Sequence, residues 1–442
     1  MMKIKTKKVK QKTKKKSFFN LFKNLQPMRV YGKIADPKKL ILLFQILIFG
    51  LTLYSDEEGT VDPKGAILFL LLIILVYFSN TFIPKITKGD PYLFQVASVL
   101  FTIGVAMIYR LNSNQGIKQM IVFLIGMIVF YIVYFLLKSY KGWHKLTLFY
   151  LLGCFFLFAI TFVLGNRHMG AINWIKIGSF SFQPAEITKI LFVFFIASYQ
   201  VNDRFLDKLK KHKIYKYKEY FLLIIMYMII GLFFIQRDLG MAMVMYGVFL
   251  VNQFIHGDDK KLIFINLGLA IIGAIAAYVL FVHIRVRVAT WINPWKYISG
   301  QGYQITQSLF AISSGGFFGT GIGLGKPDLI PVVESDFIFS AICEEMGVFT
   351  GMAIIMLFLI LVYRGFKISL EQRDPFYKYV AMGISAMFGF QAIIMFGGVL
   401  KLIPLTGLTT PFVSYGGSSM ISSFICLGIL QFCSSDVREK VE

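Results

Sequence analysis

The sequence predicts an all-α polytopic membrane protein with about twelve transmembrane helices, and three observations carry that prediction. Of the 442 residues 57% are hydrophobic and only 16% are charged, and the mean hydropathy is +0.68. Such a composition is typical of membrane proteins. Apolar runs close to the length that crosses a bilayer, about 17 to 25 residues, recur along the chain. Lys and Arg gather in alternate connecting segments, as they do in cytoplasmic loops.

The apolar runs are the predicted spans, and the first, sixth and seventh of them are short. They cover residues 40–55, 65–83, 92–109, 119–137, 147–164, 186–200, 220–235, 239–256, 262–281, 337–363, 379–398 and 415–433. An even number of spans puts both termini in the cytoplasm if the Lys-rich amino terminus lies there. The net charge of +23 then reflects topology and attraction to anionic lipid, rather than nucleic-acid binding.

The chain divides into a basic cytoplasmic tail at 1–39, two amino-terminal spans at 40–91, a core at 92–435 and a short cytoplasmic tail at 436–442. In the first tail, four apolar residues fall on one helical face. They are Phe18, Leu21, Phe22 and Leu25. The segment is therefore either a helix lying on the cytoplasmic leaflet or a disordered orienting tail.

Two familiar kinds of site are not indicated. The four cysteines all lie in apolar runs without a CxxC pair, so they are expected to be packing residues rather than disulfides or zinc ligands. The stretch GTGIGLGK at 319–326 lacks the preceding strand and the GK[ST] ending of a phosphate-binding loop. Its glycines are expected to form a tight turn.

A Gly- and Trp-containing loop at 165–183 leads into a helix at Pro184, a residue favoured in a first helical turn. Glu186 and Lys189 stand three apart on that helix and are expected to pair. An ion pair inside a membrane points to function, although a structural pair is the alternative. Between the seventh and eighth spans, Asp238 is either a cap of the next helix or a functional acid.

The longest interruption between apolar runs, an extracytoplasmic loop at 282–336, ends at Asp336. Within it Arg285 and Arg287 are two apart, so on an extended segment both would face one way and bind a phosphate or lipid headgroups. Asp336 is either the N-cap of the next helix or a base. The nearby acids Glu334, Glu344 and Glu345 favour the base, because crowded carboxylates have raised pKa values.

Five motifs of the chain resemble those of a known family. They are GAINWIKIGSFSFQPAEITK, QRDLG, NPW with GYQITQSLFAISSGG, SDFIFSAICEEMG and PLTGLTTPFVSYGGSS, at residues 170–419 in the family's order. The sequence is similar to the shape, elongation, division and sporulation (SEDS) family of FtsW, RodA and SpoVE over about residues 92–435. The commonest architecture of that family has ten spans, which would make residues 40–91 an addition.

The resemblance implies a peptidoglycan glycosyltransferase that polymerises lipid II at the outer face of the cytoplasmic membrane, for division, elongation or sporulation, with a class B penicillin-binding protein as partner. It makes Asp336 the essential acid. The residues expected to bind substrate are Trp174, Gln183, Glu186, Lys189, Asp238, Arg285, Arg287, Gln304, Gln307, Ser308, Glu334, Glu344, Glu345 and Ser414.

Three positions depart from the family's pattern. Many members have Arg where this chain has Asn173, many have Glu where it has Val332, and some have Lys where it has Thr406. Glu334 could replace the acid missing at 332.

The expected reaction follows from the substrate. Asp336 would take the proton from the acceptor's 4-hydroxyl, which attacks the anomeric carbon of the donor and displaces undecaprenyl pyrophosphate with inversion. Arg285, Arg287 and Lys189, with a divalent cation such as Mg²⁺ or Mn²⁺, would hold the pyrophosphate charge. The alternatives are a lipid II flippase, for which the sequence shows no internal repeat, and a non-catalytic scaffold for a synthase.

Overall fold

The computed structural model describes residues 36–54, 62–168, 171–177, 180–202, 218–256 and 260–439. The chain separates into an amino-terminal unit, Met1–Leu40, and a main unit, Ile41–Glu442. Of the first unit, only residues 36–40 are described. The expected interfacial helix at 18–25 and most of the basic loop after the sixth span lie outside the described residues.

Twelve helices coincide with the predicted apolar runs, and ten of these helices in the described residues are long and apolar enough to cross a membrane. The prediction of an all-α polytopic protein is thereby confirmed. The helices are α2 (Pro37–Tyr54), α3 (Pro63–Thr87), α4 (Pro91–Leu111), α5 (Ser113–Ser139), α6 (Thr147–Leu164), α7 (Ala185–Val201), α9 (Lys218–Gln236), α10 (Leu239–His256), α11 (Lys260–Leu280), α14 (Ile338–Glu371), α15 (Pro375–Val399) and α16 (Gly417–Glu439).

Four of the spans begin at an Asp-Pro pair. Each of the four carboxylates accepts at least one hydrogen bond from a backbone amide of the first turn, and the next residue is Pro; the acids are Asp36, Asp62, Asp90 and Asp374. The carboxylate satisfies amides that have no partner within the helix, and proline brings a suitable φ angle. The local sequence therefore fixes where α2, α3, α4 and α15 start.

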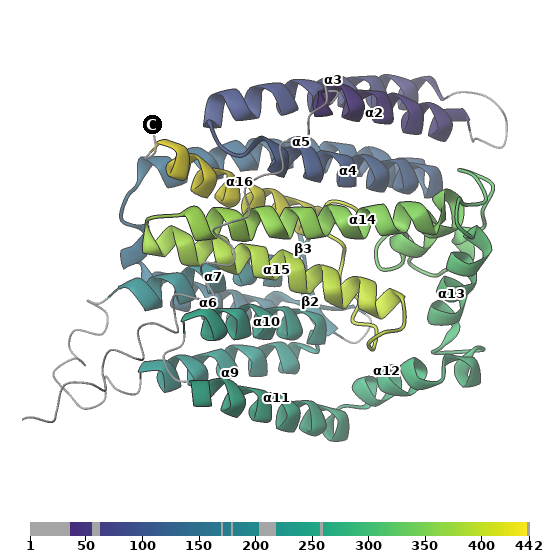
Figure 1. The fold of residues 1–442 in the computed structure, drawn as a ribbon. Coiled ribbons are helices and arrows are strands. Elements are labelled where there is room, and N and C mark those ends of the chain that lie inside the picture. Colours follow the sequence, from purple (N-terminus) through teal and green to yellow (C-terminus); the bar gives the residue numbers. More distant parts are fainter. Residues whose placement is uncertain are drawn as a thin grey trace, which may run out of the picture. The chain divides into compact units, whose positions relative to one another are not determined.

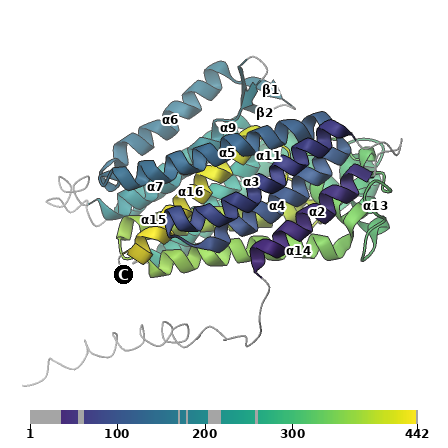
Figure 2. The ribbon, with the colours of Figure 1, turned by 90° about the horizontal axis from the view of Figure 1, so that it is seen from above.

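In the main unit, α14 runs beside α15, and α13 (Tyr303–Gly315) packs near the end of the bundle where α14 begins (Figure 1). The view from above shows α6 beside α7 (Figure 2). α4 is buried along nearly its whole length. Aromatic contacts fill the interior, such as Phe101 on Phe123 with ring centroids 4.1 Å apart.

Two polar pairs join α2 and α3 to α4. Gln45 donates to Thr102 Oγ1 at 3.0 Å, and Asn80 donates to Ser98 Oγ at 3.3 Å. Each hydroxyl also donates to a backbone carbonyl of its own helix. Hydrogen bonds between apolar helices fix their register, because an unpaired amide in hydrocarbon is costly.

The two long connections contain regular structure that the sequence analysis did not predict. The segment before α7 forms β1 (Asn166–His168), β2 (Ala171–Ile177) and β3 (Phe180–Phe182), an antiparallel sheet in the order β1-β2-β3. The segment before α14 holds α12 (Val282–Ile292) and α13, with the short 3₁₀ turns η3 (Pro294–Tyr297) and η4 (Pro327–Leu329).

Candidate functional site

Asp336 lies in a turn directly before α14. Phe337 occupies the N-cap position and makes no side-chain cap, so the described structure does not use Asp336 to hold the helix end. The Asp336 carboxylate accepts a hydrogen bond from Ser335 Oγ at 3.0 Å. Its other oxygen faces Gly407 in the last loop, where an added Cβ would lie 3.4 Å from it. Asp336 is therefore a partly buried acid turned toward residues 400–416.

The pKa of Asp336 is raised above its ordinary value, chiefly by burial and further by the negative charge of Glu334. The hydrogen bond from Ser335 and the positive charge of Arg287 oppose this rise. Arg287 is itself partly buried and donates to the Thr406 carbonyl at 3.0 Å. A carboxyl group with a raised pKa is suited to accept a proton near neutral pH.

The expectation that Arg285 and Arg287 face the same way is wrong. Both lie on α12, where residues two apart point in nearly opposite directions because a helix has 3.6 residues per turn. Arg285 is exposed, and Arg287 is turned inward, where it interacts with the charges of Asp238 and Asp336. The two arginines therefore cannot bind one phosphate together from the same face of α12. Arg287 instead interacts with the charges of the two acids.

Asp238 caps α10, because its Oδ1 accepts from the Met241 amide at 3.0 Å; the cap is one of the two alternatives that the sequence left open for this residue. Its Oδ2 accepts from Asn173 Nδ2 at 3.0 Å and from Gln183 Nε2 at 3.2 Å. The pKa of Asp238 is raised by burial. These hydrogen bonds and the positive charge of Arg287 oppose this rise. One carboxylate thus joins the strand segment, the start of α7 and the start of α10.

The predicted pair of Glu186 and Lys189 is confirmed, with Lys189 Nζ 2.6 Å from Glu186 Oε2. Both side chains are buried. Ser422 of α16 also donates to Glu186 Oε2. Lys189 donates further to Gln391 Oε1 at 3.3 Å, and the Gln391 amide donates to the Thr409 carbonyl at 3.1 Å. The pair therefore cross-links α7, α15, α16 and the last loop.

The turn that carries Asp336 is fixed by its neighbours. Glu334 Oε1 accepts from Gln115 Nε2 at 3.1 Å, and its carbonyl accepts from the Tyr415 amide at 2.9 Å. Ser414 Oγ donates to the Ser335 carbonyl at 2.6 Å. The start of α5 and the last loop thus hold the turn from two sides.

Glu344 and Glu345 belong to a different neighbourhood. Glu344 Oε1 accepts from the Lys326 amide at 2.9 Å, and Glu345 Oε1 pairs with Arg110 Nε at 2.9 Å. Both acids therefore contact the glycine-rich loop, residues 316–328. The charges that shift the pKa of Asp336 are instead those of Arg287 and Glu334.

The remaining predicted residues lie on two elements, α13 and β2. Gln304 and Gln307 are partly buried on α13, and Ser308 on the same helix lies 2.7 Å from Ser340 of α14, Oγ to Oγ. Trp174 is partly buried on β2, and its Cα pairs with that of Asn166 across the sheet. Elsewhere, hydrogen bonds join Asn173 and Gln183 to Asp238, and the charge of Arg287 interacts with those of Asp238 and Asp336.

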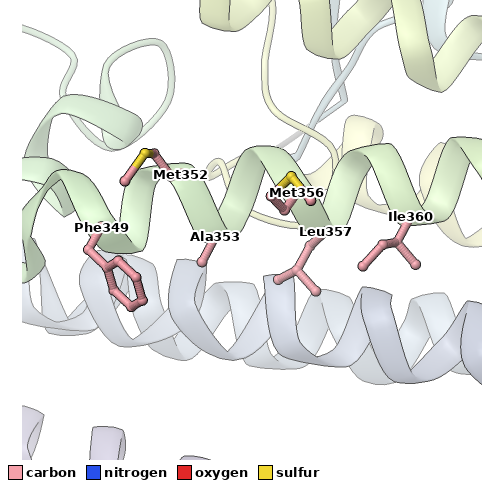
Figure 3. Close-up of a pocket in the computed structure, with 6 residues that line it drawn as sticks. All are labelled: Phe349, Met352, Ala353, Met356, Leu357 and Ile360. Carbon is pink, nitrogen blue, oxygen red and sulfur yellow. The ribbon is translucent and has the colours of Figure 1, made fainter. Parts of the chain in front are cut away.

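A hollow of about 410 Å³ lies along α14 (Figure 3). Phe349, Met352, Ala353, Met356, Leu357 and Ile360 line it. All six side chains are apolar, so none of them can exchange a proton or bind an anion.

Sequence reasoning missed several polar residues of the site. Gln391 lies in an apolar run, so no charge pattern marked it. Ser418 and Ser422 stand four apart on α16, and Ser418 Oγ accepts from the Gln183 amide at 3.1 Å. This helical spacing was the available signal, since residues four apart share a helix face.

Comparison with known proteins gives a consistent result. The profile of the family described as cell cycle protein, of FtsW, RodA and SpoVE, matches residues 90–439. The peptidoglycan glycosyltransferase RodA of Mycobacterium tuberculosis (strain ATCC 25618 / H37Rv) is 36% identical over 368 residues, covering 79% of this chain and 78% of the relative. Stage V sporulation protein E of Bacillus subtilis (strain 168) is 33% identical, with 78% and 97% covered.

Solved structures share the fold. A structure described as "structural coordination of polymerization and crosslinking by a peptidoglycan synthase complex" matches with a TM-score of 0.65 at 24% identity, covering 79% of this chain and 98% of that chain. The rod shape determining protein RodA of Thermus thermophilus matches with a TM-score of 0.59 at 22% identity, covering 81% and 100%.

Proposed function

We propose that this chain, which belongs to the FtsW, RodA and SpoVE family and is a multi-pass peptidoglycan glycosyltransferase, polymerises lipid II at the cell membrane with Asp336 as its base. One observation carries the proposal. Asp336 is an acid with a raised pKa that is not used to cap α14, it faces Gly407 of the last loop, and the positive charge of Arg287 acts on it.

In the proposed reaction, Asp336 accepts the proton of the acceptor's 4-hydroxyl as that oxygen bonds to the anomeric carbon of the donor. The bond between that carbon and the undecaprenyl pyrophosphate oxygen breaks, and the configuration inverts because attack comes from the face opposite the leaving group. The hydrogen bond from Ser335 orients the carboxylate, which is what a base needs before the substrate arrives.

Arg287 is the favoured partner of the pyrophosphate, with Arg285 as an exposed second cation on α12. The proposal does not use Lys189 there, because its ammonium is buried against Glu186 and Gln391. Sugar hydroxyls would be bound by Trp174, Gln304, Gln307 and the hydroxyl-rich last loop. Asn173, Gln183 and Asp238, which are joined by hydrogen bonds, would form a second polar surface beside the substrate.

A divalent cation, Mg²⁺ or Mn²⁺, is a further proposal. Among the described residues no group of three or more His, Cys, Asp and Glu side chains could hold a metal by itself. Glu334 could contribute one carboxylate, and Mg²⁺ is often held by one or two carboxylates with substrate phosphates. The metal would neutralise pyrophosphate charge. Chelation by EDTA, followed by return of Mg²⁺, tests this, and full activity in EDTA would exclude it.

The partner is proposed to be a class B penicillin-binding protein, a transpeptidase that cross-links the new strand. The family membership supports this, as does the fold shared with a structure titled as a peptidoglycan synthase complex. Both termini are proposed to lie in the cytoplasm, which puts Asp336 outside. Residues 92–435 would form the catalytic core, and α2 and α3 would be additions to it.

The deciding experiment incubates the purified protein with lipid II and separates glycan strands on a gel. The proposed enzyme gives strands, and Asp336→Asn gives none while retaining the wild-type unfolding midpoint. Movement of labelled lipid II between leaflets of a vesicle without strand formation would favour the flippase. Absence of both activities in the presence of an intact partner would favour the scaffold.

A further inference from the structure

The helix that follows Asp336 is broken. At Gly347 the backbone of α14 has φ 84° and ψ 162°, which is outside the helical region, so α14 consists of a short segment at 338–346 and a long one at 348–371. Asp336 precedes the short segment, called here the half-helix. An added Cβ at Gly347 would lie 2.3 Å from the Phe317 carbonyl, so both the φ angle and the space require glycine.

The glycine-rich loop fills the break. The amides of Thr320 and Gly321 donate to the carbonyls of Glu344 and Glu345 at 2.9 and 3.0 Å. On the far side of the break, the Val348 amide donates to the Gly316 carbonyl at 3.0 Å. The loop therefore replaces the hydrogen bonds that an unbroken helix would make, as non-helical backbone within a membrane protein requires.

Arg110, at the end of α4, ties the half-helix to this loop. Its Nε lies 2.9 Å from Glu345 Oε1, and its Nη2 donates to the Gly325 carbonyl at 3.2 Å. A third contact, of 3.5 Å, reaches Asp328. The other oxygen of Glu345 accepts from the Gly323 amide at 3.1 Å. One guanidinium thus joins α4, the loop and the half-helix, and Glu345 is buried.

The residue before Arg110 is also fixed. Tyr109 donates to Asp62, the cap of α3, at 2.7 Å. Gly116 of α5 approaches so closely that an added Cβ would lie 2.6 Å from the Tyr109 Cα. The end of α4 is therefore a rigid point from which Arg110 reaches the half-helix.

We propose that Arg110 is a positioning residue for the reaction: through Glu345 it holds the half-helix, and so Asp336, in the geometry that proton transfer needs. Arg110 need not touch the substrate. The proposal rests on Asp336 as base, and it predicts that loss of Arg110 lowers the rate of the chemical step rather than the affinity for lipid II. A base displaced by about 1 Å can cost about 100-fold in rate.

The test compares Arg110→Gln with Arg364→Gln. Arg364 makes an ion pair with Asp90, 2.5 Å from Nη2 to Oδ2, but it stands in the long segment of α14 far along the chain from Asp336. We expect both variants to lower the unfolding midpoint, whereas only Arg110→Gln lowers kcat per folded molecule, by about 10- to 100-fold, with KM within about twofold of the wild type. Arg110→Lys, which keeps the charge, should recover part of the kcat that Arg110→Gln loses. If Arg110→Gln does not fold, Arg110→Lys is compared with the wild type in its place.

Two further measurements make the result specific. Glu345→Gln should lower kcat as Arg110→Gln does, and the double variant should be no slower than either, because the two residues act as one unit. Equal losses in Arg110→Gln and Arg364→Gln, or an unchanged kcat in Arg110→Gln, would overturn the positioning role. The assignment of the base fails separately, if Asp336→Asn retains activity.

Discussion

The ammonium of Lys189 lies 2.6 Å from the Glu186 carboxylate three residues before it on α7, and neither side chain reaches the surface. Glu186→Gln should leave a buried positive charge without its partner, and breaking such a pair typically costs about 3 to 5 kcal/mol. We expect a marked fall in the unfolding midpoint in detergent. The double variant Glu186→Gln with Lys189→Met should be more stable than the single one, since no uncompensated charge remains. A single variant as stable as the wild type would contradict the role of the pair.

Asp336→Asn should lower the rate of lipid II polymerisation by about 100- to 10,000-fold, the usual contribution of a general base. Asparagine has nearly the same shape but cannot accept the proton. Steady-state polymerisation with purified protein checks the prediction. Ser335→Ala serves as a milder comparison, because it removes only the hydroxyl that orients the carboxylate.

The pH dependence should report on Asp336. The reaction needs its ionised form, so the rate should fall as the pH drops through the pKa, which burial raises above the ordinary value of about 3.9. Arg287→Gln removes a charge that lowers this pKa, so the acid limb of the pH-rate profile should move to higher pH. Rates measured between about pH 4 and 8 test this. A limb that stays in place would show that Arg287 does not act on the base.

Asp238 offers a comparison of two functions in one side chain. Asp238→Asn keeps an oxygen for the Met241 amide but turns an NH₂ group toward Asn173 and Gln183. Asp238→Ala loses the cap as well, which alone costs about 0.5 to 2 kcal/mol. We expect the alanine variant to unfold at the lower temperature and both variants to bind lipid II more weakly. Equal unfolding midpoints would contradict the capping role.

The contact of α3 with α4 should be sensitive to one methyl group. An added Cβ at Gly65 would lie 2.0 Å from the Tyr109 hydroxyl, whereas nothing lies within 4 Å of one at Gly50. Gly65→Ala should therefore destabilise the protein by about 1 to 3 kcal/mol. Gly50→Ala, one turn before the end of α2, should stabilise it by up to about 1 kcal/mol through helix propensity. Thermal unfolding of both variants provides the measurement.

Much of the fold followed from the sequence because the length of an apolar run is a local property. The pairing of Glu186 with Lys189 and the cap by Asp238, the latter one of two alternatives considered for that acid, also depend on spacings of three residues, and the structure shows both. What failed depended on contacts distant in sequence. α12 was expected to be extended, and the inward turn of Arg287 toward Thr406 is set by a loop more than a hundred residues away.

The break in α14 illustrates the same limit. Glu344 and Glu345 lie in an apolar run whose pattern predicts one continuous helix. A single glycine, Gly347, is not enough to predict a break in it. Only the folded loop at 316–328 supplies the hydrogen bonds that make the break tolerable. No single window of sequence contains both halves of that arrangement.

The polar pairs that join the first two helices to α4 are one-sided. Ser98 and Thr102 keep their own backbone hydrogen bonds whether or not a neighbour is present, whereas Gln45 and Asn80 need those hydroxyls. Within these two pairs the dependence runs in one direction: the hydroxyls of Ser98 and Thr102 keep a hydrogen bond without α2 and α3, whereas the amide donors of Gln45 and Asn80 would lose their partners in hydrocarbon without α4. The first two helices therefore have an energetic reason to stay attached to α4.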